Sequence, residues 1–196
     1  MKTVSPAFKS LSRALALAAL VCIVSCKGKD ESKSANAATA QSDVKPPEID
    51  IHTAVVTGNL DALKQHIQAG TNLNERDPFG GSSPLISAGV FGKTEAAREL
   101  INAGADINFQ NNEGSTALHT AAFFCRPEIV KMLLEKGADK TIKNKYNATP
   151  DESVTAPFAD VKGAYDMMAQ VLGPMGLKLD YTYIEKTRPE IANLLK

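Results

Sequence analysis

The stretch that decides the fold is residues 114–139, which read GSTALHTAAFFCRPEIVKMLLEKGAD. Parts of this stretch return at a fixed distance along the chain. Residues 83–85 read SPL, 33 positions before the TAL of residues 116–118, and residues 149–150 read TP, 33 positions after the start of that TAL. A glycine recurs as well, at spacings of 34 and 33 residues, as Gly70, Gly104 and Gly137. A period near 33 residues indicates a solenoid built from one repeated structural unit.

Each part of the unit carries a residue type that favours a helix, a turn and a second helix. Thr116 has a hydroxyl suited to cap the first helix, and small side chains at Ala121 and Ala122 let neighbouring helices approach closely. Gly137 supplies a left-handed residue that ends the second helix. The apolar residues of the second helix form one stripe: Ile129, Val130, Leu133 and Leu134. We therefore expect pairs of helices that bury their apolar sides against one another.

The unit resembles the ankyrin repeat, whose pattern is a β-turn, a Thr-Pro-Leu-His-x-Ala inner helix, an outer helix and a Gly-Ala-Asp loop. The resemblance implies an all-α solenoid of about four repeats, with short β-turn or hairpin connections. We place the repeats at residues 49–74, 75–108, 109–143 and 144–196. The first repeat lacks the Thr and Pro of the pattern, as terminal repeats often do because one of their faces meets water.

The third repeat departs from the pattern at two positions. Ala117 replaces the proline, and Cys125 replaces the glycine between the helices, which is present as Gly58 and Gly92 in the first two repeats. A residue other than glycine at positive φ costs about 1 kcal/mol. The turn at Cys125 is therefore expected to be either strained or differently shaped.

The fourth repeat is irregular. Thr149 and Pro150 begin it on schedule, but the Arg-Pro-Glu-Ile of residues 126–129 returns only at residues 188–191, after 62 positions instead of 33, an excess of 29. The inserted segment, about residues 157–186, contains an amphipathic candidate helix at 161–172 and strand-like alternation at 177–183. An insertion in a solenoid often lies on the binding face, but a cap that seals the end of the stack fits equally well. The sequence leaves both interpretations open.

The N-terminus resembles a bacterial lipoprotein signal peptide. Residues 1–25 combine basic residues, an apolar run from Ala14 to Val24 that is too short to span a bilayer, and a small residue, Ser25. The Ile-Val-Ser-Cys of residues 23–26 resembles the lipobox, which implies acyl chains on Cys26; an ordinary signal peptide with an incidental cysteine is the alternative. Residues 26–48 are mostly small and polar, which predicts a flexible tether with a reach of roughly 25 Å.

This N-terminus implies a location in a bacterial cell envelope, lipid-anchored and facing the periplasm. Lys27 after the lipid-bearing cysteine, by analogy with other lipoproteins, favours the outer over the inner membrane. The whole chain has a formal charge of zero, and removal of residues 1–25 takes away three basic residues, which leaves 19 basic against 22 acidic residues. This balance provides no positive surface for nucleic acid.

Candidates for chemistry are few. His52 and His119 fall at the motif histidine, which in ankyrin repeats hydrogen-bonds the neighbouring turn. Cys125 is the single cysteine of the repeat region, and a thiol enzyme using it is the outsider among our hypotheses. The sequence shows no spacing typical of a metal site, and neither a phosphate loop nor any other cofactor motif. We therefore expect a protein that is not an enzyme and has no cofactor.

Protein binding is the better-supported hypothesis. Ankyrin repeats contact partners through hairpin tips and exposed inner-helix positions, which line a concave face. The matching tip positions are Phe79, Asn112, Glu113, Lys145 and Tyr146, and the matching inner-helix positions are Val90, Phe91, Phe123 and Phe124. Aromatic residues gathered on one exposed surface mark an interaction site. The alternative is that the insertion folds back over Phe123 and Phe124 and buries them.

These observations predict a monomeric, non-catalytic interaction module that binds another protein through its concave face. An envelope scaffold is the first form of this hypothesis. The alternative is an immunity or inhibitor protein that blocks a toxic enzyme, with the segment at 157–186 as the plug.

Overall fold

The computed structural model describes residues 44–196. The predicted signal segment, Cys26 and the tether as far as residue 43 lie outside the described residues. The helices are α1 (Ile51–Thr57), α2 (Leu60–Gln68), α3 (Pro84–Phe91), α4 (Thr94–Asn102), α5 (Ala117–Phe123), α6 (Pro127–Glu135), α7 (Glu152–Thr155), α8 (Phe158–Leu172) and α9 (Tyr181–Leu195), with a 3-10 turn at Gly173–Met175. Within residues 44–196 there is no strand, and no helix has both the length and the apolar character needed to cross a membrane.

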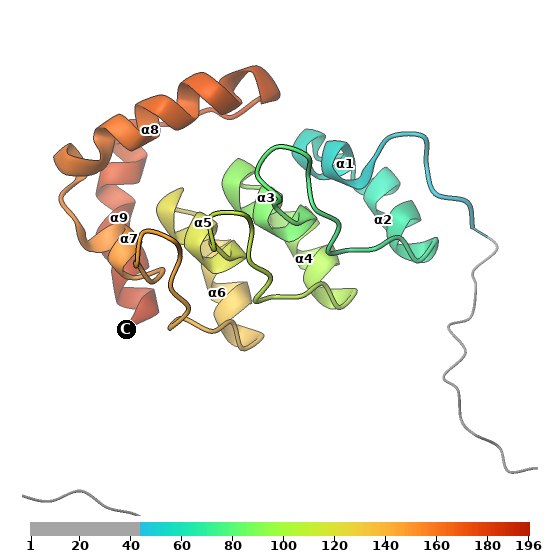
Figure 1. Ribbon diagram of the computed structural model, residues 1–196, viewed down its shortest axis with the longest axis horizontal. Coiled ribbons are helices and arrows are strands. Elements are labelled where there is room, and N and C mark those ends of the chain that lie inside the picture. Colours follow the sequence, from blue (N-terminus) through green and yellow to red (C-terminus); the bar gives the residue numbers. More distant parts are fainter. Residues whose placement is uncertain (1–43) are drawn as a thin grey trace, which may run out of the picture. The chain divides into compact units, whose positions relative to one another are not determined.

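The first six helices form three pairs that stack side by side. The inner helices α1, α3 and α5 make one row and the outer helices α2, α4 and α6 make a second row (Figure 1). Each inner helix packs on its partner and on the inner helix of the next pair. The prediction of an all-α solenoid is confirmed.

Local sequence signals set the helix ends as expected. Thr116 caps α5, and the side chain of His119 reaches back to the backbone N–H of Thr116, with Nδ1 and N 3.2 Å apart. Ser83 caps α3 in the same register. The turns between inner and outer helices need a left-handed residue, and Gly92 provides it with φ 64°.

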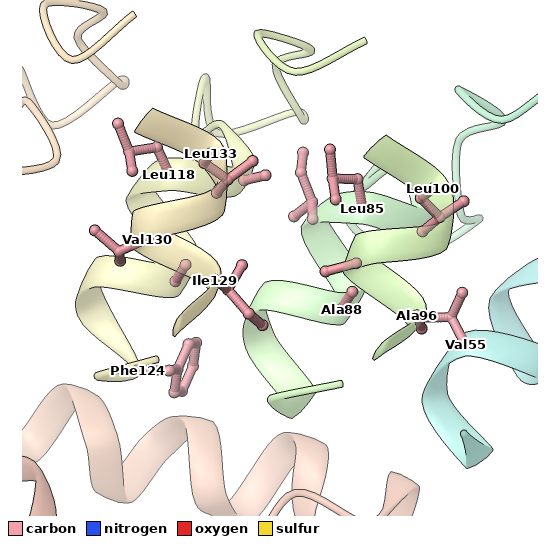
Figure 2. Close-up of a cluster of buried hydrophobic side chains, with 14 of the residues drawn as sticks. Val55, Leu85, Ala88, Ala96, Leu100, Leu118, Phe124, Ile129, Val130 and Leu133 are labelled. Carbon is pink, nitrogen blue, oxygen red and sulfur yellow. The ribbon is translucent and has the colours of Figure 1, made fainter. Parts of the chain in front are cut away.

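The core lies between the two rows of helices. Leucines from both rows are fully buried, among them Leu85 and Leu118 of the inner helices and Leu100 and Leu133 of the outer helices (Figure 2). Each side chain of this size contributes about 2 kcal/mol when it leaves water. The aligned leucines of adjacent pairs therefore tie each repeat to the next, which is the source of stability in a solenoid.

The fourth repeat begins as an ankyrin repeat and then changes course. Thr149 and Glu152 cap the start of its inner helix reciprocally, but α7 ends after four residues. Ala156 is extended, with ψ 148°, because the residue before a proline avoids the helical region and Pro157 follows it. The chain then forms α8 and α9, which lie beyond the third pair at the end of the stack (Figure 1).

The insertion contains the expected helix but not the expected strand. The candidate helix at 161–172 is confirmed as part of α8, which starts at Phe158. The strand-like prediction for 177–183 is wrong, because α9 already begins at Tyr181, capped by the Asp180 side chain, which accepts from the backbone N–H of Tyr183 at 3.0 Å. The alternation has another cause: Leu177 is buried in the core while its neighbour Lys178 is exposed, without a partner strand.

The last residues of the predicted tether are fixed to the domain. The carbonyl oxygen of Lys45 accepts from Gln65 Nε2 at 2.8 Å, and that of Ile49 lies 2.8 Å from His66 Nε2. His66 is 4% exposed, so the segment before α1 is held by a buried side chain of α2. This contact covers part of the outer surface of the first repeat.

Candidate functional site

Three turns project from the stack, one before each of α3, α5 and α7. Each turn is closed by the side-chain oxygen of an Asp or Asn at its base, which accepts backbone N–H groups from the tip. These bonds run to Asp77 from Phe79 at 2.8 Å, Gly80 at 2.8 Å and Ser82 at 2.6 Å, to Asn111 from Glu113 at 3.0 Å and Ser115 at 2.9 Å, and to Asn144 from Tyr146 at 3.0 Å and Ala148 at 3.2 Å. The tips are therefore held in one conformation by bonds that do not use their outward-facing side chains.

The acidic side chain in the first turn shows the strength of this arrangement. Burial alone raises the pKa of Asp77, but hydrogen bonds from Gly80, Phe79 and Ser82 outweigh that effect and lower the pKa of the carboxyl below its usual value. The charged form of Asp77 is thus the one that holds the tip.

The three turns are also joined to one another. The backbone N–H of Asn112 donates to the carbonyl of Gly80 at 2.9 Å, and that of Lys145 donates to the carbonyl of Glu113 at 2.9 Å. Neighbouring tips are therefore linked by main-chain bonds into one platform. A surface fixed in this way loses little conformational entropy when a partner binds.

The side chains on the tips point away from the protein. Phe79 is 85% exposed and Tyr146 is 74% exposed, and Asn112, Glu113 and Lys145 are exposed as well. A hydrogen bond to the Glu113 carboxylate raises the pKa of Tyr146, which shows that the second and third tips also meet through side chains. We name these five residues the tip row. All five sequence-predicted tip residues lie on one surface.

The four inner-helix candidates divide into two groups. Val90 and Phe91, at the end of α3, are partly exposed. Phe124 is only 4% exposed, so the prediction of an exposed binding position is wrong for this residue. Phe123 keeps partial exposure, but its ring stacks on Tyr165 of α8 with centroids 4.3 Å apart. The self-covering alternative therefore holds for the third repeat, and the second repeat keeps its surface.

The cover over Phe123 and Phe124 is built around one tyrosine and one arginine. Tyr165 is fully buried, and its hydroxyl donates to the carbonyl of Phe123 at 2.5 Å and accepts from Arg188 Nη1 at 2.9 Å. Arg188, 3% exposed, also donates to the carbonyl of Ala156 at 2.9 Å. Burial raises the pKa of Tyr165 to about 12. This side of α8 is a cap.

The opposite side of α8 is exposed. Met167, Val171 and Met175 are 53%, 62% and 45% exposed, and they follow one another along the helix and the 3-10 turn after it. The insertion thus covers the repeats with one face and presents apolar side chains with the other, so both interpretations of it describe a part of the structure.

The thiol of Cys125 is unsuited to nucleophilic chemistry. Cys125 has no exposed surface, and its Sγ lies 3.6 Å from the carbonyl oxygen of Ile184. Burial raises the pKa of this thiol to about 11, although the positive charges of Arg188 and Arg126 oppose the effect. A reactive cysteine needs a low pKa and access to solvent. Its backbone has φ 53°, so of the two expected forms of this turn the strained one occurs.

The two motif histidines behave differently. His119 Nε2 lies 3.1 Å from the carbonyl oxygen of Ala148 in the next turn, as expected. Both ring nitrogens of His52 are buried without a hydrogen-bond partner, so the same prediction for His52 is wrong. The hydroxyl that Thr116 offers to His119 is absent in the first repeat, where Ile49 stands in that place.

Arg126 is a candidate binding residue that the sequence reasoning missed. Its side chain lines a cavity of about 240 Å³ together with Gly92, Thr94, Cys125, Pro127, Glu128 and Tyr183. A signal for it exists in the sequence, because a basic residue follows the turn residue in both the second and third repeats, as Lys93 and Arg126.

Comparison with known proteins agrees with this architecture. Residues 51–144 match the family described as ankyrin repeats (3 copies). The chain is 39% identical over 70 residues to the human DNA-binding protein RFXANK, covering 36% of this chain and 27% of that protein. It is 38% identical over 64 residues to human protein phosphatase 1 regulatory subunit 27, covering 33% and 41%.

A solved structure shares the fold. The ankyrin repeat domain of Bcl-3 aligns with a TM-score of 0.51 and 32% identity, over 53% of this chain and 45% of that one. The match spans less than half the length of each of these three proteins. The paired helices, the glycine turns and these similarities agree, and the chain is therefore an ankyrin-repeat protein with three repeats over residues 51–144.

Proposed function

We propose that this chain is a non-catalytic module that binds a protein partner through the tip row and the exposed end of α3. The observation that carries the proposal is the pair of aromatic rings, Phe79 and Tyr146, at 85% and 74% exposure on turns that are fixed from below. Ankyrin repeats mediate protein–protein interaction, and the other similarities given above include a regulatory subunit.

Physical chemistry supports an aromatic row as the binding element. An aromatic side chain buries about 150–250 Å² when a partner covers it, and such anchors commonly contribute 2 kcal/mol or more to an interface. Phe79 and Tyr146 lie on the first and third turns, with Asn112 and Glu113 on the second turn between them. Two aromatic anchors flanking polar groups give both affinity and specificity.

We also propose that the module is held on a bacterial envelope membrane by acyl chains on Cys26 and faces the periplasm. The support is the lipobox-like sequence at residues 23–26 and the polar segment after it. With about 0.8 kcal/mol for each buried methylene, more than one acyl chain gives stable anchoring. Replacement of Cys26 by alanine is expected to release the protein from membranes into the soluble fraction; retention of this variant on membranes would refute the anchor.

Site-specific crosslinking tests the binding proposal. A photoreactive phenylalanine analogue is placed at Phe79 or Tyr146, and, as a control, at Glu135 on the exposed side of α6. The full-length chain is irradiated in its cells and purified from detergent-solubilised membranes. Adducts with the same protein from both tip positions, and none from the control, are expected. Equal labelling from all three positions would refute a tip-directed interaction.

The second candidate function is an inhibitor or immunity protein that blocks a toxic enzyme. The observation that favours it is the exposed apolar side of α8, with Met167 and Val171. Flexible, polarisable methionine side chains adapt to a partner surface. Under this hypothesis a crosslinker at Val171 captures a secreted hydrolase or toxin as the sole partner, and polar replacement of Met167 and Val171 abolishes protection. A partner captured from the tips but not from α8 favours the scaffold.

A further inference from the structure

A cavity of about 240 Å³ lies where three elements meet: the turn between α3 and α4, the turn between α5 and α6, and the first turn of α9. It is several times larger than the roughly 30 Å³ that one water molecule occupies in the liquid. Among the residues of its lining, Arg126 is the positively charged one. The cavity is therefore large enough for a small polar group beside a guanidinium.

The guanidinium of Arg126 is incompletely paired. Its Nη2 donates to the carbonyl of Val90 at 3.3 Å, while its Nε is buried and has no hydrogen-bond partner. Among residues 44–196, no carboxylate forms an ion pair with it. A buried donor of a charged group that lacks a partner is unfavourable, typically by more than 1–3 kcal/mol. An added acceptor at this place would remove that cost.

The backbone holds Arg126 at the cavity. A Cβ atom at Gly92 would lie 2.8 Å from Arg126 Nε, so the guanidinium occupies space that exists only because residue 92 is glycine. Lys93 lies over Gly58 in the same way one repeat earlier, with Nζ 3.6 Å from the place of a Cβ. Around Arg126, however, α9 adds a wall with Tyr183. The cap thus turns an exposed repeat position into an enclosed one.

The other polar groups of the lining define the charge that fits. Thr94 and Tyr183 bring hydroxyl groups, and α6 begins at Pro127 without a side-chain cap. The Glu128 carboxylate is present as well, where it accepts from Thr94 Oγ1 at 3.4 Å. Since Glu128 repels negative charge, it penalises a doubly charged phosphate more than a singly charged carboxylate. Planar guanidinium groups match carboxylates with two parallel hydrogen bonds.

We propose that this cavity is a binding site for a carboxylate, supplied by an acidic side chain of the protein partner and paired with Arg126. The proposal rests on the proposed function in one respect, that the ligand belongs to a protein. Arg126 hydrogen-bonds the carbonyl of Val90, so the site is continuous with the exposed end of α3. A partner that lies on this end of α3 brings its acidic residue within reach of the cavity.

A titration with small molecules tests the site without the partner. The full-length chain, labelled with ¹⁵N, is titrated with N-acetyl-aspartate methylamide and separately with the uncharged asparagine analogue, while the Arg126 Nε–H and the backbone amides of Gly92 and Glu128 are followed by NMR. We expect saturable shifts of these signals with the aspartate compound, with a Kd on the order of millimolar, and none with the asparagine compound.

Two variants and a second anion complete the experiment. Arg126→Gln is expected to abolish the backbone shifts, and Glu128→Gln, which removes the repelling charge, to tighten binding several-fold. Equal responses to both compounds, or persistence of the shifts in Arg126→Gln, would overturn the proposal. Tighter binding of inorganic phosphate than of the aspartate compound would overturn its choice of ligand.

The result is independent of the proposed function. If the aspartate compound binds but tip crosslinks fail, the carboxylate site stands and the protein-binding surface falls. If tip crosslinks succeed but the titration shows no saturation, the reverse holds. Where both succeed, Arg126→Gln is expected to weaken the identified partner about tenfold or more, and unchanged partner affinity would show that the partner brings no carboxylate to this site.

Discussion

Replacement of Tyr165 by phenylalanine tests whether the insertion caps the repeats through one hydroxyl group. The ring and its stacking on Phe123 remain, so the change removes only the bonds of the hydroxyl to the carbonyl of Phe123 at 2.5 Å and to Arg188 Nη1 at 2.9 Å. Arg188 is 3% exposed, and its Nε already has no partner, so water cannot easily replace the lost acceptor.

The expected loss follows from the two bonds. A neutral hydrogen bond contributes about 1 kcal/mol to stability, and one to a charged group contributes about 1.5–3 kcal/mol. Tyr165→Phe should therefore lower the free energy of unfolding by about 3 kcal/mol. For a domain of about 150 residues this corresponds to a fall in the melting temperature of roughly 6–12 °C.

Urea denaturation followed by circular dichroism measures this change, with linear extrapolation to zero urea. Tyr146→Phe is the matched control, because its ring is 74% exposed on a turn, and it should alter stability by less than about 0.5 kcal/mol. A loss below about 1 kcal/mol in Tyr165→Phe would refute the argument, since Arg188 would then have other partners or a different position.

Three further predictions concern the repeats. Gly89→Ala should destabilise the protein by about 1–2 kcal/mol in urea, because its Cβ would lie 2.6 Å from Thr120 Oγ1 and 3.3 Å from the carbonyl oxygen of Ala117, whereas Gly163→Ala, with nothing within 4 Å, should stabilise it by about 1 kcal/mol. Phe124→Ala should cost about 3–5 kcal/mol by the same assay, and a melting temperature like that of the parent would show that this ring is not buried. For Cys125 the folded pKa of about 11 lies above the usual 9.0, so the unfolded chain releases this proton first; stability should fall by roughly 3 kcal/mol at most between pH 9 and 11, and Cys125→Ala should lack this component.

The repeat architecture was predictable because its signals are local and recur. Thr116, the glycines of the turns and the apolar stripes each act within one helix pair, so the same interpretation applies once for every 33 residues. The tip residues were predictable for the same reason, since their exposure follows from their place in the turn. Their role in binding stays a prediction.

The errors fall where distant parts of the chain meet. The side chain of Phe124 is buried by Tyr165, 41 positions further on, and no period in the sequence records that contact. The strand-like prediction for residues 177–183 failed because a packed, irregular segment can have the same alternation as a strand. The unpaired nitrogens of His52 depend on one missing hydroxyl, which a motif match does not weigh.

The cap explains why a repeat protein can carry two adjacent phenylalanines at the end of its third inner helix. In a stack that ended there, Phe123 and Phe124 would form an exposed apolar patch and promote aggregation. Here Pro157 ends the next inner helix early, and Tyr165 on α8 takes the place that a longer inner helix would have filled. The insertion therefore removes binding surface from the third repeat, and through Tyr183 it also adds a wall beside Arg126. One insertion thus shifts the available surface toward the turns and the second repeat, and for this reason we place the partner there and not along the whole concave face.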